Sequence, residues 1–268
     1  MRQNALTPSQ PNASAPAHNG PANLAEDLLD PLLGPWTKGF PGSAVPLRRS
    51  QVAAQGWNVL DGDLPLPLAV IDQAALNHNL GWLQDFARTR GLDLAPHGKT
   101  TMSPQLFSRQ LQAGAWGLTV ANVTQLQVAV ASGAQRILIA NQVLTAADLQ
   151  GLDAVRRAHP GLTVACLLDS AAQLQAMEAQ ALTQPFTQPL DVLVELGVAG
   201  VRTGVRDHAD ALALARLAHA SPAVRLVGVE CYEGLAVQGD SEKDGEQAQA
   251  LMNRLMALAR QLDAEGLF

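Results

Sequence analysis

The chain has 268 residues, of which 47% are hydrophobic and 16% charged, enough apolar material for one large α/β domain or two small ones. Its mean hydropathy is +0.05 and no apolar run reaches eighteen residues, which argues against global disorder and against a membrane-spanning helix. The net charge is −6 and no basic stripe occurs, so we expect neither a nucleic acid nor a membrane as partner.

The first residues contain no apolar segment of the kind found in secretory signals, so we expect a cytoplasmic protein. Cys166 and Cys231 lie in apolar runs, which predicts buried, reduced thiols. Two distant cysteines without clustered histidines make no recognisable zinc site, so no metal ligand is assigned in this chain.

Three regions follow one another along the chain. Residues 1–23 are rich in Pro, Asn, Ala and Ser and have no hydrophobic period, which predicts a disordered tail. Residues 24–65 mix short apolar patches with prolines and glycines, which predicts an irregular lead-in with a short helix near residues 24–33. From residue 66 to residue 268, strand-like apolar runs alternate with helical stretches.

This alternation predicts a parallel sheet with helices on both faces, because the strands are nearly continuously apolar. Ser103-Pro104 and Asp169-Ser170 provide good starts for two of the helices. The strand-like runs are residues 66–72, 92–98, 117–122, 136–141, 162–169, 190–197 and 224–234.

Two arrangements fit this order: a doubly wound sheet and a (β/α)8 barrel. No GxGxxG motif follows an early strand, which weakens a dinucleotide-binding fold. Polar residues recur at the carboxyl ends of the runs, which meet on one face of a barrel, and this favours the barrel. If residues 66–72 lie outside it, six barrel strands remain. The polar residues are His97, Lys99, Asn122, Asn141, Asp169, Glu195, Tyr232 and Glu233.

Lys99 is the candidate nucleophile. The chain has only three lysines: Lys38 lies in the lead-in and Lys243 in a charged stretch, whereas Lys99 follows a strand-like run. A lysine at a barrel mouth is partly desolvated, which frees its amine to form a Schiff base with an aldehyde. The alternative is an ordinary loop lysine.

Three other residues join Lys99 as candidates. His97 lies two residues earlier on an extended segment and points the same way, so it can exchange protons near the amine, unless it is a structural histidine. The glycines of VELGVAGVRTGVR fix Arg202 near the mouth, where a guanidinium suits an anionic oxygen, unless it is a surface arginine. Tyr232 can pack beside a flat cofactor, unless it is a core tyrosine.

The segment Pro96-His97-Gly98-Lys99-Thr100 resembles the cofactor-lysine motif of the fold-type III pyridoxal-phosphate enzymes related to D-threonine aldolase and D-serine dehydratase. The segments ILIANQVL, ELGVAGVRTGVR and GVECYEG resemble the bacterial amino acid deaminases of that family, in order, over about residues 24–240. Many relatives have Arg where Ala95 stands and Asp where Gly197 stands. The fold implied is an alanine-racemase-like barrel followed by a β-rich C-terminal domain.

The resemblance also implies roles for the candidates. Lys99 is expected to form the internal aldimine with pyridoxal phosphate and to be the catalytic residue. Arg202 is expected at the phenolic oxygen of the cofactor and Tyr232 against its pyridine ring, with His97 as a further cofactor-binding residue.

Relatives in this family are longer, so we expect residues 66–268 to be a partial barrel that lacks two strands and the C-terminal domain. Phosphate sites in barrels commonly follow strands seven and eight, so that half of the site is expected to be absent. Zinc is expected only in full-length relatives, whose His and Cys ligands lie in the missing part. Family members often complete their sites from a partner subunit, which makes a homodimer the expected assembly.

The function implied is a pyridoxal-phosphate-dependent deaminase or dehydratase for small hydroxy amino acids such as D-serine, yielding a keto acid and ammonia by β-elimination. Two alternatives stay open: carbon–carbon cleavage of the D-threonine aldolase type, and a non-enzymatic pyridoxal-phosphate homeostasis protein.

Overall fold

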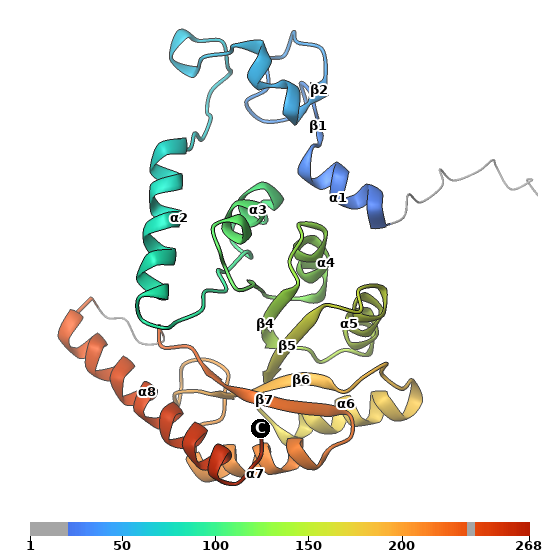
Figure 1. Cartoon of the computed structure of the whole chain (residues 1–268), viewed down its shortest axis with the longest axis vertical. Coiled ribbons are helices and arrows are strands. Elements are labelled where there is room, and N and C mark those ends of the chain that lie inside the picture. Colours follow the sequence, from blue (N-terminus) through green and yellow to red (C-terminus); the bar gives the residue numbers. More distant parts are fainter. Residues whose placement is uncertain (1–20, 235–238) are drawn as a thin grey trace, which may run out of the picture. The chain divides into compact units, whose positions relative to one another are not determined.

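A computed structural model describes residues 21–234 and 239–268 of the chain (Figure 1). The predicted disordered tail lies outside the described residues except for its last three, which belong to a helix. The chain divides into two compact units, Met1–Leu68 and Ala69–Phe268. None of the described helices is long and apolar enough to cross a lipid bilayer.

The first unit contains little regular structure. Its helix α1 (Pro21–Leu29) begins and ends a few residues earlier than the predicted short helix. Strands β1 (Leu32–Leu33) and β2 (Leu47–Arg48) pair antiparallel, and three 3-10 turns follow. Asp30 accepts hydrogen bonds from the Ser50 amide at 2.6 Å and the Ser50 hydroxyl at 2.8 Å, and these bonds lower the pKa of its carboxyl group. The turns are η1 (Arg49–Gln51), η2 (Ala53–Gln55) and η3 (Val59–Asp61).

The strand predicted at residues 66–72 is absent from the structure. Pro65 and Pro67 lack the amide hydrogen that a sheet ladder needs, so this apolar run cannot pair regularly. It leads instead into α2 (Gln73–Arg88), where the Asp72 carboxylate accepts a hydrogen bond from the Ala75 amide at 2.7 Å and caps the helix.

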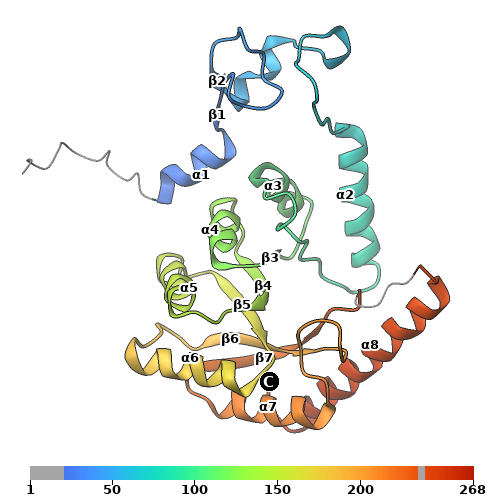
Figure 2. The same cartoon turned by 180° about the vertical axis from the view of Figure 1, so that it is seen from behind.

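The second unit alternates helices with parallel strands (Figures 1 and 2). After α2 its helices are α3 (Pro104–Gln112), α4 (Val123–Ala131), α5 (Ala146–Ala158), α6 (Ala171–Thr183), α7 (His208–Ala220) and α8 (Ser241–Ala264). Its strands are β3 (Leu118–Val120), β4 (Arg136–Gln142), β5 (Thr163–Leu168), β6 (Leu190–Leu196) and β7 (Val224–Cys231).

The strands form one sheet in the order β3-β4-β5-β6-β7, and every neighbouring pair is parallel. Each strand thus lies beside its successor in the sequence, as in a barrel. A doubly wound sheet would instead reverse its order at a switch point. The sheet order confirms the barrel-type arrangement over the doubly wound one.

The expected strand at residues 92–98 is reduced to one parallel bridge between His97 and Thr119. The Trp116 amide donates to the Leu94 carbonyl at 2.8 Å, and the Thr119 amide donates to the Pro96 carbonyl at 2.9 Å. Pro96 has no amide hydrogen to return, which interrupts the ladder. The sheet therefore has five strands rather than the predicted six.

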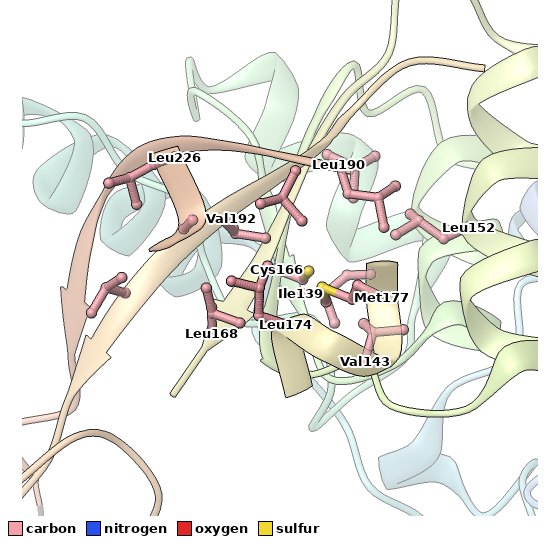
Figure 3. Close-up of a cluster of buried hydrophobic side chains, with 14 of the residues drawn as sticks. Ile139, Val143, Leu152, Cys166, Leu168, Leu174, Met177, Leu190, Val192 and Leu226 are labelled. Atoms are coloured by element: carbon pink, nitrogen blue, oxygen red, sulfur yellow. The ribbon is translucent and has the colours of Figure 1, made fainter. Parts of the chain in front are cut away.

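The hydrophobic core lies on one face of the sheet, where alternate strand residues meet the helices. Met177 and Leu174 of α6 pack here against strand residues, as Figure 3 shows. The intervening strand positions include Thr119, Asp191 and Glu195, which are buried but polar. Buried apolar residues such as Leu167 also occur at these positions, so the second face of the sheet is buried and mixed, rather than uniformly apolar as predicted. The strand members of the core include Ile137, Ile139, Val164, Cys166, Leu168, Leu190, Val192, Val194, Leu196, Val224 and Leu226.

Candidate functional site

The candidate site lies at the carboxyl edge of the sheet. Because all five strands are parallel, the residues that follow them share this edge. Three segments supply the side chains of the site: the turn after His97, the loop between β6 and α7, and the end of β7.

The turn that carries Lys99 is fixed by the residues before and after it. The Gly98 amide donates to the Thr119 carbonyl at 2.7 Å, and the Met102 amide closes the turn on the Gly98 carbonyl at 2.9 Å. Gly98 is buried, and a Cβ atom there would lie 2.5 Å from the ring of the fully buried Phe107. The backbone at Lys99 is thus held between the sheet and α3.

The Lys99 side chain is exposed, and no hydrogen bond or ion pair to another described residue involves its amine. The prediction that this amine is partly shielded from solvent is therefore wrong. Lys243, by contrast, pairs with Asp240 at 3.3 Å. Burial of the ring and the nearby charge of Lys99 both lower the pKa of His97, which favours its neutral form.

The loop between β6 and α7 carries Arg202 and is tied to two neighbouring strands. The Thr203 hydroxyl donates to Glu195 Oε1 on β6 at 2.9 Å. The Gly204 amide donates to Asp169 Oδ2, directly after β5, at 3.2 Å. At Gly197, a Cβ atom would overlap the Thr203 carbonyl oxygen. Only glycine therefore leaves room for the loop backbone to pass close to this position.

Two further arginines hold the base of this loop. Arg206 donates to the carbonyl oxygens of Thr203 at 2.6 Å and Gly204 at 2.7 Å, and also to the Arg202 carbonyl. Arg254, on α8, donates to the Gly197 carbonyl at 3.3 Å and the Arg206 carbonyl at 2.7 Å. The loop is therefore tethered at both ends.

The structure brings two of the predicted site residues together. The Arg202 guanidinium lies over the Tyr232 ring, 4.5 Å from its centroid. Tyr232 is 40% exposed, so it is no core tyrosine. Among the described residues, no hydrogen bond or ion pair joins Lys99 or His97 to Arg202 or Tyr232.

The sequence analysis named Glu195 at a strand end but missed Glu230, which lies next to it. Glu195 and Glu230 are register partners on β6 and β7. Burial, together with the charges of Glu195 and Glu233, raises the pKa of Glu230 to about 7. In the described part of the chain, Glu230 Oε2 is the one fully buried side-chain oxygen or nitrogen without a hydrogen bond. The sequence contains one signal for Glu230: it stands two residues before Tyr232, and residues two apart on an extended strand lie on the same side.

The site combines an exposed primary amine, a guanidinium over an aromatic ring, and a carboxyl pair of which Glu195 is buried and Glu230 half-buried. These groups can attack a carbonyl carbon, bind an anionic oxygen and pack against a flat ring. Within residues 21–234 and 239–268, no group of three or more His, Cys, Asp or Glu side chains is placed to hold a metal ion.

Known proteins resemble this chain in sequence and in fold. The model of the family called alanine racemase, N-terminal domain, matches residues 71–268. A D-threonine aldolase from Arthrobacter sp. is 36% identical over 168 residues, which are 63% of this chain and 43% of the aldolase. D-threo-3-hydroxyaspartate dehydratase from Delftia sp. (strain HT23) is 32% identical over 193 residues, 71% of this chain and 48% of the dehydratase.

The solved structure of the Delftia dehydratase superposes with a TM-score of 0.64 at 29% identity, over 76% of this chain and 53% of that one. The predicted resemblance and the alanine-racemase-like α/β fold are thereby confirmed. The chain spans about half the length of the curated relatives it matches.

Proposed function

Because this chain belongs to the family of the alanine racemase N-terminal domain, we propose that it is a pyridoxal-phosphate-dependent lyase for small β-hydroxy amino acids of D-configuration. We assign cofactor attachment to Lys99. The observation that supports this assignment most directly is that Lys99 is exposed on a backbone fixed by Gly98 and Phe107, with no partner for its amine among the described residues.

The residues present fit the cofactor by their chemistry. A Schiff base with an aldehyde needs a primary amine, which Lys99 provides without a hydrogen bond or ion pair to any described residue. The phenolic oxygen is an anion that a guanidinium binds well, and Arg202 lies over a ring that can face a pyridine. The buried Glu230 Oε2 leaves one further hydrogen-bonding position at this edge.

Bound pyridoxal phosphate supplies a ring that accepts electrons from the substrate α-carbon. The residues of the chain do the rest. With the cofactor bound, Lys99 Nζ would be the group that takes the α-proton of the substrate. His97 lies two residues before Lys99 with its neutral form favoured, so one of its ring nitrogens can accept a hydrogen bond near the amine. Arg202 and Tyr232 orient the bound molecule.

For the reaction we propose β-elimination, in which a hydroxy amino acid such as D-serine yields a keto acid and ammonia. The likeness to the Delftia dehydratase supports this choice. The likeness to the Arthrobacter D-threonine aldolase equally supports carbon–carbon cleavage, which is the second candidate.

Attachment is tested by loading the chain with pyridoxal phosphate, reducing it with borohydride and mapping the labelled peptide. We expect the label on Lys99, and Lys99→Ala should remove both the label and the visible absorbance of the bound cofactor. Lys243→Ala, a matched control on the exposed start of α8, should keep both. A label on Lys38 or Lys243 would contradict the assignment.

The reaction is tested by product analysis with D-serine and D-threonine. Keto acid and ammonia support the dehydratase, whereas glycine with an aldehyde supports the aldolase. Cofactor binding without turnover points to the non-enzymatic alternative. Repeating the assay with added zinc, and measuring the oligomeric state by sedimentation, tests the metal and homodimer expectations.

A further inference from the structure

We propose that Glu195 is a positioning residue, which acts through the Thr203 hydroxyl to hold Arg202 over Tyr232, in the orientation that cofactor binding requires. The proposal rests on the proposed function, since it concerns the same site. Glu195 itself touches neither Arg202 nor Tyr232 through any hydrogen bond or ion pair in the described part of the chain.

Glu195 connects three segments. Its side chain lies on β6, with the residue 4% exposed. Oε1 accepts a hydrogen bond from the Thr203 hydroxyl at 2.9 Å, and Oε2 accepts one from Gln142 Nε2, at the end of β4, at 2.5 Å. Both carboxylate oxygens are thus occupied, and the loop is tied to the sheet by a bond to an acidic group, which is stronger than a neutral one.

Thr203 is the sequence neighbour of Arg202, so its hydroxyl anchors the loop next to the guanidinium. The other tethers, from Asp169, Arg206 and Arg254, hold backbone groups of the loop. Among these tethers, the hydrogen bond from Thr203 to Glu195 alone joins a side chain of the loop to a buried carboxylate. Its loss should release the tip of the loop while its base stays in place.

The charge of the neighbouring groups supports this division of roles. Glu230, the register partner of Glu195, lies within electrostatic range of Arg202, and burial disfavours its ionised form. The electrostatic attraction between Glu230 and Arg202 is correspondingly weakened. The backbone of Arg202 is held by the Arg206 bond to its carbonyl, and the Thr203–Glu195 bond adds a second anchor directly beside its side chain.

The first test needs no cofactor, because Tyr232 is the only tyrosine of the chain. In an NMR sample with isotope-labelled tyrosine, the single set of ring signals from Tyr232 reports on the guanidinium above the ring. We expect Thr203→Val to shift these signals toward those of Arg202→Ala, and Thr203→Ser to restore them. Thr183→Val, the same change on the exposed end of α6, should leave them as in the unchanged protein.

The second test measures the dissociation constant of pyridoxal phosphate by absorbance titration. Thr203→Val should weaken binding about tenfold, the effect of losing one hydrogen bond to a charged group, and Glu195→Gln, which keeps one acceptor oxygen but loses the charge, should weaken it less. Adding Arg202→Ala to Thr203→Val should then cost little more. Thermal unfolding of the cofactor-free variants reports any general loss of stability.

Additive effects of Thr203→Val and Arg202→Ala, or tyrosine signals unchanged by Thr203→Val but shifted by Arg202→Ala, would overturn the proposal. Failure of the proposed function looks different: the borohydride label would be missing from Lys99 in the unchanged protein. The two hypotheses are therefore separable.

Discussion

Glu230 lies half-buried at the end of β7, and its environment opposes ionisation. Its desolvation and the charges of Glu195 and Glu233 raise its pKa from 4.5 to about 7, while the charge of Arg202 acts the other way. In the unfolded chain this carboxyl group ionises near its ordinary value. Between the two values the folded protein holds a proton that the unfolded chain has released.

Folding stability should therefore fall as the pH rises from about 4.5 to about 7, and level off above that range. The loss is at most about 3 kcal/mol, since each unit of pKa shift is worth about 1.4 kcal/mol. We expect Glu230→Gln to remove this part of the pH dependence in urea unfolding experiments. Glu246→Gln, on the exposed face of α8, should keep it. Equal pH profiles for the unchanged protein and Glu230→Gln would contradict the assignment.

The loop from Gly197 to Arg206 is the element that shapes the site. Gly204 has a φ of +98°, and a Cβ atom there would lie 2.6 Å from the Gly197 amide nitrogen. Two segments of backbone pass each other at this point, and only glycine permits both the approach and the conformation. Gly200, in the same loop, has a φ of +76° but open space around it.

Substitutions at these two glycines separate the cost of an unfavourable backbone conformation from the cost of a side chain that overlaps neighbouring backbone. Gly200→Ala should destabilise the protein by about 1 kcal/mol, because only the backbone conformation is unfavourable. Gly204→Ala should cost clearly more, because the methyl group also meets backbone, and it should disturb the tyrosine signals of Tyr232. Urea unfolding gives the comparison. Equal losses for the two variants would show that the close approach does not matter.

For the sheet as a whole, β7 is the last strand in the order and pairs only with β6 among the described residues. An edge strand exposes unpaired backbone groups, which favours association with other chains. Val227 lies at an irregularity of this strand and is 40% exposed, which adds an apolar group to the edge.

A charge on this edge should reduce self-association. We expect Val227→Lys to lower the light scattering of concentrated samples and to make their elution volume depend less on protein concentration. Leu217→Lys makes the same kind of change on α7, at a residue 52% exposed, and should have little effect. Unchanged scattering for Val227→Lys would mean that β7 is not the associating edge.

Local signals in the sequence predicted most of the elements. Ser103 and Ser170 cap the helices that they were expected to start, because a side-chain oxygen followed by helix-forming residues satisfies the free amides of the first turn. The runs that became β3 to β7 were also predicted, because buried parallel strands need continuous apolar residues. The strand prediction at residues 66–72 was wrong, since the prolines of this run outweigh its hydrophobicity.

The sequence by itself determined the kind of fold, the family and the importance of the edge that follows the strands, because helix starts, apolar strands and short motifs depend on neighbours along the chain. Only the tertiary structure decided that Arg202 lies over Tyr232, that Lys99 stays exposed, and that Glu195 lies beside Glu230. The two pairs join residues about thirty positions apart in the sequence. They follow from strand register and from the path of a glycine loop, which packing of the whole sheet fixes.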